Sequence, residues 1–201
     1  MNDSRKRTLL LSIIFSGIGP FVLVYAAFLN TSVTQLADLL RRSAELSVLI
    51  IAYFMYSYLQ KEPNKTVKYQ RLMYQISGVV LMTSAALLMV VLTLNILNPR
   101  IPSGNVYLGL SVAGLGVLFN GYFALRYQRF HRQKPNVVMD SQGKIYQAKT
   151  LVDVNVVIAL SSILIIHDLT ILSWIDRVGT GIIILYLLIR GILLYQTSLK
   201  P

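Results

Sequence analysis

The sequence predicts an all-α integral membrane protein with six transmembrane helices and both termini in the cytoplasm. The first observation is its long uncharged stretches. None of residues 8–37 carries a charge, and the same holds between Arg71 and Arg100 and between Arg100 and Arg126. About 20 apolar residues in a helix are enough to cross ~30 Å of hydrocarbon. The second observation is composition, because charged residues make up 13% of the chain against about 25% in soluble domains.

The first predicted helix covers about residues 9–29 and follows a short basic segment. Its apolar run is too long for a typical signal sequence and lacks a small-residue cleavage site. We therefore expect it to be retained as a membrane span. Pro20, with Gly17 and Gly19 beside it, predicts a kink.

The second and third predicted helices cover about residues 32–59 and 70–97. Asn30 and Thr31 form a short predicted turn, and Ser32 is a plausible N-cap for the second helix. A polar segment with Pro63 separates the second helix from the third.

The last three predicted helices cover about residues 106–129, 145–172 and 178–197. Proline, glycine and asparagine at 98–104 predict a turn before the fourth helix, and Pro135 and Gly143 predict a polar loop over 131–144. We expect residues 1–201 to form a single six-helix transmembrane domain without a C-terminal cytoplasmic domain.

The distribution of basic residues predicts the orientation. Two of them, Arg100 and Arg177, fall on one side of the membrane. Twelve fall on the other: Arg5, Lys6, Arg7, Lys61, Lys65, Lys68, Arg71, Arg129, Arg132, Lys134, Lys144 and Lys200. The positive-inside rule places the richer side in the cytoplasm, together with both termini. An even number of crossings is then required, and six satisfies it.

Four ionisable residues are expected at membrane depth, and we call them the charged tetrad. Arg41 and Glu45 lie four residues apart in the second predicted helix, and Lys149 and Asp153 do so in the fifth. Each pair therefore shares one helix face. If these two helices pack antiparallel, Arg41 can reach Asp153 and Lys149 can reach Glu45.

Two interpretations of the charged tetrad are open at this stage. A lone charge at the bilayer centre costs ~2.5–3.5 kcal/mol on the insertion scale, so cross-helix ion pairs would act as a structural clamp. The alternative is that the four residues line a polar pathway. Asp38 and Asn120 are accessory candidates. Asp38 is expected to pair locally with an arginine one turn away, and Asn120 to form a hydrogen bond between helices.

The segment around the charged residues of the second helix resembles the cation diffusion facilitator family of proton-coupled divalent-metal exporters. Residues 31–45, TSVTQLADLLRRSAE, are similar to the family pattern G-S-x-x-L-L-A-D-A-x-H/D-x-x-x-D. On this resemblance, Arg41 and Glu45 occupy two metal-ligand positions of the family. Lys149 and Asp153 occupy the other two, and Asp176 follows Asp153 by the 23 residues that the family shows.

The departures from the family pattern concern the metal site. Two of the four ligand positions hold cations, and an arginine cannot lose its proton to bind a metal. A fixed guanidinium near a dication costs several kcal/mol even at an effective dielectric of about 20. The four-ligand zinc site of the family is therefore not expected, and we expect no metal and no cofactor.

The resemblance implies a cation-efflux-like transporter, with proton-coupled transport of a cation, in the plasma or inner membrane. The alternative is a transport-silent member that acts as a partner or scaffold for another membrane protein. The resemblance also implies a homodimer or hetero-oligomer in the lipid bilayer. An enzyme is not expected, because the chain has no Cys, two His and no Gly-rich phosphate loop. Nucleic-acid binding is not expected either, since the net charge of +11 is explained by basic loops facing anionic headgroups.

Overall fold

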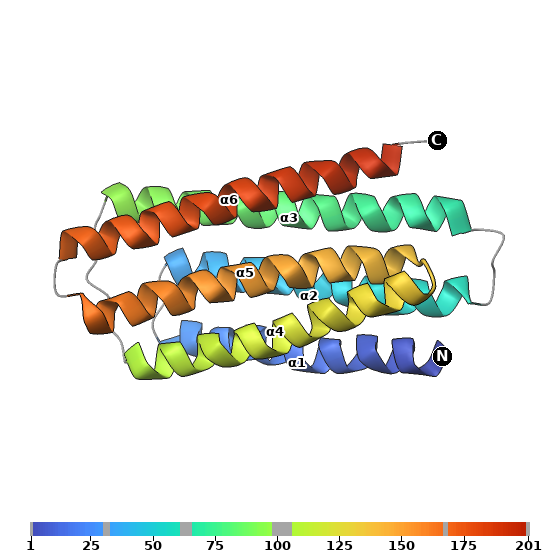
Figure 1. The fold of residues 1–201 in the computed structure, drawn as a ribbon, viewed down its shortest axis with the longest axis horizontal. Helices are drawn as coiled ribbons and strands as arrows, with labels where there is room; N and C mark the ends of the chain where they lie inside the picture. Colours follow the sequence, from blue (N-terminus) through green and yellow to red (C-terminus); the bar gives the residue numbers. More distant parts are fainter. Residues whose placement is uncertain (1, 30–32, 61–65, 98–105, 167–168, 200–201) are drawn as a thin grey trace.

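The computed structural model describes residues 2–29, 33–60, 66–97, 106–166 and 169–199. Within these ranges the chain forms six helices and no strand: α1 (Asn2–Leu29), α2 (Val33–Leu59), α3 (Thr66–Leu97), α4 (Val106–Gln133), α5 (Val137–Ile165) and α6 (Leu169–Leu199). Successive helices run in opposite directions, so that α1 begins and α6 ends at the same end of an elongated bundle (Figure 1). The turns expected at 30–31 and 98–104, the N-cap at Ser32 and most of the polar segment before α3 lie outside the described residues.

The expected loop at 131–144 is wrong, because most of it is helical. Helix α4 continues to Gln133 and α5 begins at Val137. Asn136 caps α5 by accepting a hydrogen bond from the N–H of Met139 at 3.2 Å. Lys144 and Asp140 then form an ion pair one helical turn apart, at 2.6 Å. Polar residues that predicted a loop are thus the cap and the first turns of a helix, where Ser141 and Gln142 are buried.

Gly143 was expected to help break the helix, and instead it lies inside α5 and faces α4. A Cβ atom at this position would lie 3.5 Å from the Cβ of Tyr127 on α4, which is an ordinary van der Waals distance. The early part of α5 therefore packs against the last turns of α4.

The expected boundary between the fifth and sixth helices is also wrong. Helix α5 ends at Ile165 and α6 begins at Leu169, so Asp176 and Arg177 lie inside α6 and not in a loop. The N–H of Ile166 still bonds to the carbonyl of Ser162 at 2.8 Å, which closes the last turn of α5. Two adjacent charged residues in the sequence predicted a loop, but Asp and Arg are compatible with a helix interior.

Among the six helices, the most extensive packing is between α4 and α5 and between α3 and α6. Gly78 and Gly191 face each other where α3 and α6 cross. A Cβ at Gly78 would lie 2.7 Å from the carbonyl oxygen of Gly191, and one at Gly191 would lie 2.9 Å from that of Gly78. Small residues at such a crossing let two backbones approach closely in a membrane. Helix α2 contacts α1, α3 and α5, and these contacts place it beside the centre of the bundle.

The bundle exposes large apolar side chains and buries polar ones. Phe21 is 76% exposed, Leu118 69% and Ile165 76%, whereas Ser12 and Ser77 are fully buried. This distribution is expected where the surrounding solvent is lipid, since soluble proteins rarely expose large apolar patches. Among the described residues, two helical segments are long and apolar enough to cross a membrane, Lys68–Leu97 and Ser173–Leu199.

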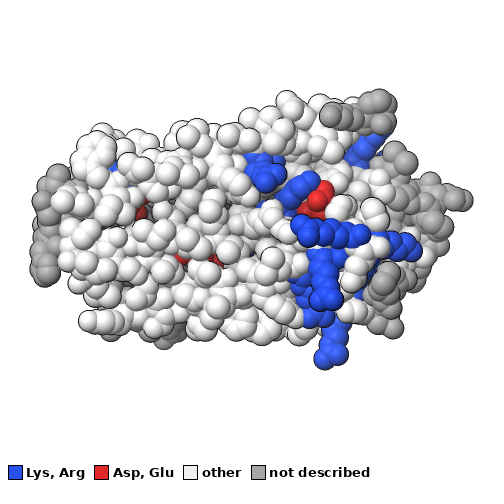
Figure 2. Space-filling model, in the orientation of Figure 1, with Lys and Arg blue, Asp and Glu red and all other residues white. Residues whose placement is uncertain are grey.

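Basic side chains gather at one end of the bundle. Figure 2 shows them concentrated on the end where α1 begins and α4 meets α5, while most of the remaining surface in that view is uncharged. Twelve basic residues were grouped by sequence on one side of the membrane. Those of the twelve that the structure describes lie at this end of the bundle.

Candidate functional site

The α2 half of the charged tetrad is an ion pair within one helix. Arg41 and Glu45 are each 6% exposed, although both are charged. The Nη1 atom of Arg41 lies 3.4 Å from Oε1 of Glu45, as the four-residue spacing allows. Helix α2 holds this pair on the side that faces the interior of the bundle.

Lys149 joins α5 to this pair. Its Nζ atom lies 3.3 Å from the second carboxylate oxygen of Glu45, so that one carboxylate is held between two cations. The expected contact between Lys149 and Glu45 is therefore confirmed. The same Nζ lies 3.4 Å from Oγ of Ser16 on α1 and 4.9 Å from the centre of the Tyr146 ring. One ammonium group thus connects α1, α2 and α5.

Asp153 has a different partner from the one expected. Its Oδ2 accepts a hydrogen bond of 2.6 Å from Nδ2 of Asn120 on α4. Among the described side chains, no ion pair joins it to Arg41, whose side chain pairs with Glu45 on its own helix. Gly116 provides the space for the Asp153 carboxylate, because a Cβ at position 116 would lie 2.6 Å from the same Oδ2. Asn120 and Gly116 lie one turn apart on α4, and together they accommodate the carboxylate.

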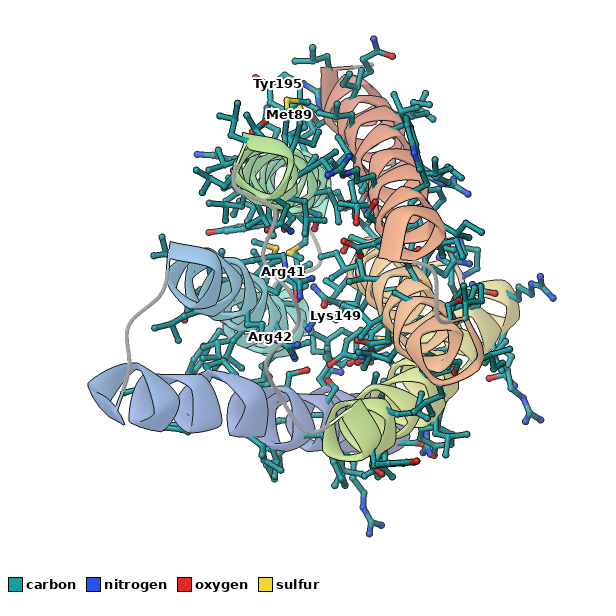
Figure 3. The ribbon with its side chains drawn as sticks, turned by 90° about the vertical axis from the view of Figure 1, so that its left-hand side faces the viewer. Arg41, Arg42, Met89, Lys149 and Tyr195 are labelled. Carbon is teal, nitrogen blue, oxygen red and sulfur yellow. The ribbon has the colours of Figure 1, made fainter. Side chains whose placement is uncertain are left out.

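Arg42, which is not one of the four tetrad residues, also enters the centre. Its guanidinium lies against α1, where a Cβ at Gly19 would be 3.3 Å from Nη1. Arg42 and Arg41 are both close enough for their charge to act on Asp153. Figure 3 shows Arg41, Arg42 and Lys149 together in the interior, between α2 and α5. The side chain of Asp38 lies outside the described residues, so its expected pairing stays a prediction.

A buried hydroxyl network extends from Lys149 along α1. Ser16 bonds to the Tyr146 hydroxyl at 2.7 Å, and that hydroxyl donates to the Ser12 carbonyl at 3.2 Å. Oγ of Ser12 lies 2.5 Å from the Tyr127 hydroxyl. Sequence reasoning missed this network. The available signal was the four-residue spacing of the two serines on an otherwise apolar helix.

The arrangement offers charges and hydrogen bonds but no clustered metal ligands. Within the described ranges, no three His, Cys, Asp or Glu residues lie close enough together to hold a metal ion. The positions of Arg41 and Lys149 explain this, since both put a cation beside Glu45. Asp176 lies in α6 and shares no hydrogen bond or ion pair with the tetrad among the described contacts.

An elongated bundle of long helices, apolar outside and charged at its centre, defines a polytopic membrane protein. The sequence profile of the Cation efflux transmembrane domain matches residues 9–200. The chain therefore belongs to the cation efflux family, a family of membrane proteins that transport cations. The family resemblance inferred from residues 31–45 is thus confirmed. No match to a curated protein was found.

Proposed function

We propose that residues 1–201 form one six-span domain that transports a cation across the membrane in exchange for protons, with both termini in the cytoplasm. Membership of a cation transporter family supports the transport role. The alternation of the six helices and the basic residues gathered at one end support the orientation. The plasma or inner membrane is the proposed location, and a homodimer or hetero-oligomer the proposed assembly.

The observation that carries this proposal is the unequal pairing of the two central carboxylates. Glu45 is held between Arg41 and Lys149, at 3.4 and 3.3 Å. Asp153 is held by the neutral amide of Asn120. Each oxygen of the Glu45 carboxylate is therefore already occupied by a neighbouring cation. We therefore assign the exchange of protons or cations to Asp153, and the clamping of α2 to α5 to Glu45.

The cations at two of the family's ligand positions, Arg41 and Lys149, limit the substrate. Arg41 cannot act as a metal ligand, and Lys149 as an ammonium cannot either. A divalent metal held by four protein ligands does not fit, whereas a monovalent cation or the proton itself needs one carboxylate. Asp153 supplies that carboxylate, with Asn120 orienting it. Arg41 and Lys149 serve as built-in counter-cations that keep the centre from attracting divalent ions.

The test is ion flux in proteoliposomes that contain the purified protein and a trapped pH-sensitive dye. Addition of Na⁺ or K⁺ outside should change the internal pH, while Zn²⁺ should not. Asp153→Asn should abolish the change. Asp140→Asn is the matched control on the same helix, because Asp140 bonds to Lys144 and Tyr74, away from the tetrad, and it should retain most of the flux. An equal change of internal pH in liposomes without the protein would reject the proposal of transport.

A transport-silent partner protein is the second candidate. The observation that favours it is that cations occupy two of the four ligand positions of the family and engage Glu45. If no ion tested produces flux in correctly folded protein, this second function replaces the first. Co-purification with one defined membrane protein in stoichiometric amount would then support it.

A further inference from the structure

A polar cavity lies at the end of the bundle where the basic residues gather, away from the charged tetrad. It has a volume of about 370 Å³ and lies between the start of α1, the end of α2, the start of α3 and the turn between α4 and α5. Polar side chains from all of these elements line it: Arg5, Gln60, Tyr69, Gln70, Lys134 and Asn136. The lining residues of the described chain include no carboxylate.

Arg5 is the buried cation of this cavity. It is 2% exposed, and its Nη2 atom donates to the carbonyls of Phe130 at 2.7 Å and Lys134 at 3.0 Å. These bonds cap the C-terminal end of α4. They leave the Nε atom of Arg5 buried and without a hydrogen-bond partner. A buried donor that makes no hydrogen bond is unfavourable, so an acceptor at this point would be stabilising.

The beginning of α5 contributes further donors to the same cavity. The first N–H groups of a helix have no acceptor within the helix. Asn136 satisfies that of Met139 with its side chain, and the described hydrogen bonds include none from the N–H groups of Val137 and Val138. Both valines line the cavity. Arg5 bonds to Lys134 in the turn that precedes α5, so its guanidinium lies beside this helix start. A helix N-terminus combined with a buried guanidinium favours an anion.

Among the described side chains that line the cavity, no acid neutralises these donors. The nearest carboxylate along α5 is Asp140, which pairs with Lys144 at 2.6 Å and accepts from the Tyr74 hydroxyl at 2.8 Å. Lys134, in contrast, lies at the rim of the cavity and is exposed. The described lining side chains therefore carry positive charge at the back and at the entrance of the cavity, and no negative charge.

We propose that this cavity binds a phosphate group, either the headgroup phosphate of an anionic phospholipid or a free phosphate. The phosphate oxygens would accept from Nε of Arg5 and from the N–H groups of Val137 and Val138, with Lys134 closing the entrance. A phosphate group matches a convergent set of several donors better than a halide does. The site holds α1, α4 and α5 together through one anion, and it does not depend on the transport proposed above.

The first experiment measures binding of two probes to the full-length protein in detergent. Native mass spectrometry compares dioleoyl-phosphatidylglycerol with dioleoyl-phosphatidylcholine, and calorimetry measures inorganic phosphate. We expect the phosphatidylglycerol adduct to exceed the phosphatidylcholine adduct at least tenfold. Competition by inorganic phosphate would identify the phosphate group as the shared determinant. Phosphate binding without lipid preference would identify a free phosphate as the ligand.

The second experiment places a carboxylate in the cavity. Gln70→Glu should reduce binding about tenfold or more, because it puts a negative charge beside the bound anion without touching the α4 cap. Gln133→Glu is the control with the same charge change, since Gln133 is exposed at the end of α4 and does not line the cavity. Arg5→Gln should abolish binding, and Arg7→Gln, an exposed neighbour, should not. Binding of neither probe, or equal effects of Gln70→Glu and Gln133→Glu, would overturn the proposal.

Discussion

One lysine determines how the centre of the bundle is organised. Lys149 contacts Glu45 on α2 and Ser16 on α1, and its ammonium group also lies over the Tyr146 ring. Its partner could be anticipated from sequence, because two pairs with four-residue spacing on antiparallel helices bring opposite charges together. The partner of Asp153 could not, because an arginine has several low-energy rotamers and the choice depends on neighbours. Gly116 and Asn120 determine the partner of Asp153. In the sequence they are separated from Asp153 by the whole connection between α4 and α5.

The pairing of Lys149 with Glu45 predicts coupled stability effects. Lys149→Leu should lower the free energy of unfolding by ~3–5 kcal/mol, because it leaves a buried carboxylate with one cation fewer. Adding Glu45→Leu should recover part of that loss. A double-mutant cycle on thermal unfolding in detergent measures the coupling.

Arg41→Leu with Asp153→Leu is the matched control cycle. These two residues share no ion pair among the described contacts, and the charge of Arg41 acts on Asp153 without direct contact, so their coupling should be weaker than that of the first cycle. Strong coupling in the control with additivity in the first cycle would contradict the observed pairing.

The cations of the tetrad predict weak zinc binding. Calorimetry should detect no stoichiometric Zn²⁺ site tighter than ~10 μM in the native sequence, since Arg41 cannot bind a metal. The double change Arg41→His with Lys149→His places two imidazoles near Glu45 and Asp153, which are suitable tetrahedral ligands, and a site should appear. A tight site in the native protein that is lost on Glu45→Ala would refute the prediction.

At the scale of the helices, composition predicted which segments are helical more reliably than where they end. Long uncharged runs located α1, α3 and α4, because lipid requires backbone groups to bond within the segment. Their ends depend instead on caps and packing beyond the apolar region. Asn136 caps α5, and Gly143 packs against α4. In the sequence, an asparagine that caps a helix and a glycine that packs against a neighbouring helix look the same as residues of a turn. The loop expected at 131–144 was therefore wrong.

The close approach of α3 and α6 predicts that one methyl group is enough to disturb it. Gly78→Ala would place a Cβ 2.7 Å from the Gly191 carbonyl oxygen and 2.9 Å from the Tyr195 amide nitrogen, both backbone atoms. Such overpacking should lower stability by about 1–3 kcal/mol, measured as a lower melting temperature in detergent.

Gly181→Ala is the control for this substitution. Gly181 lies on α6, and a Cβ there would have nothing within 4 Å. The change should leave stability equal or slightly higher, because alanine favours a helix over glycine. If Gly78→Ala and Gly181→Ala have the same effect, the crossing is looser than the contact distances indicate.

At the scale of the whole molecule, charge at the two ends predicts the orientation. A cysteine at Gln196, exposed near the end of α6, should resist a membrane-impermeant thiol reagent added to intact cells. A cysteine at Ser103, in the expected turn outside the described residues, should react. The chain has no native Cys, so each label reports one position. Reversed labelling would place both termini outside the cytoplasm.

The bond between Glu45 and Lys149 also has a consequence for how the protein is made. Helix α2 leaves the ribosome three helices before α5, so during synthesis its acid lacks the lysine that will hold it. A charged helix of this kind is costly to release into lipid alone. We expect α2 to stay beside the insertion machinery until α5 has been synthesised. A nascent chain arrested before residue 149 should therefore crosslink to the translocon through α2, and one arrested after α5 should not.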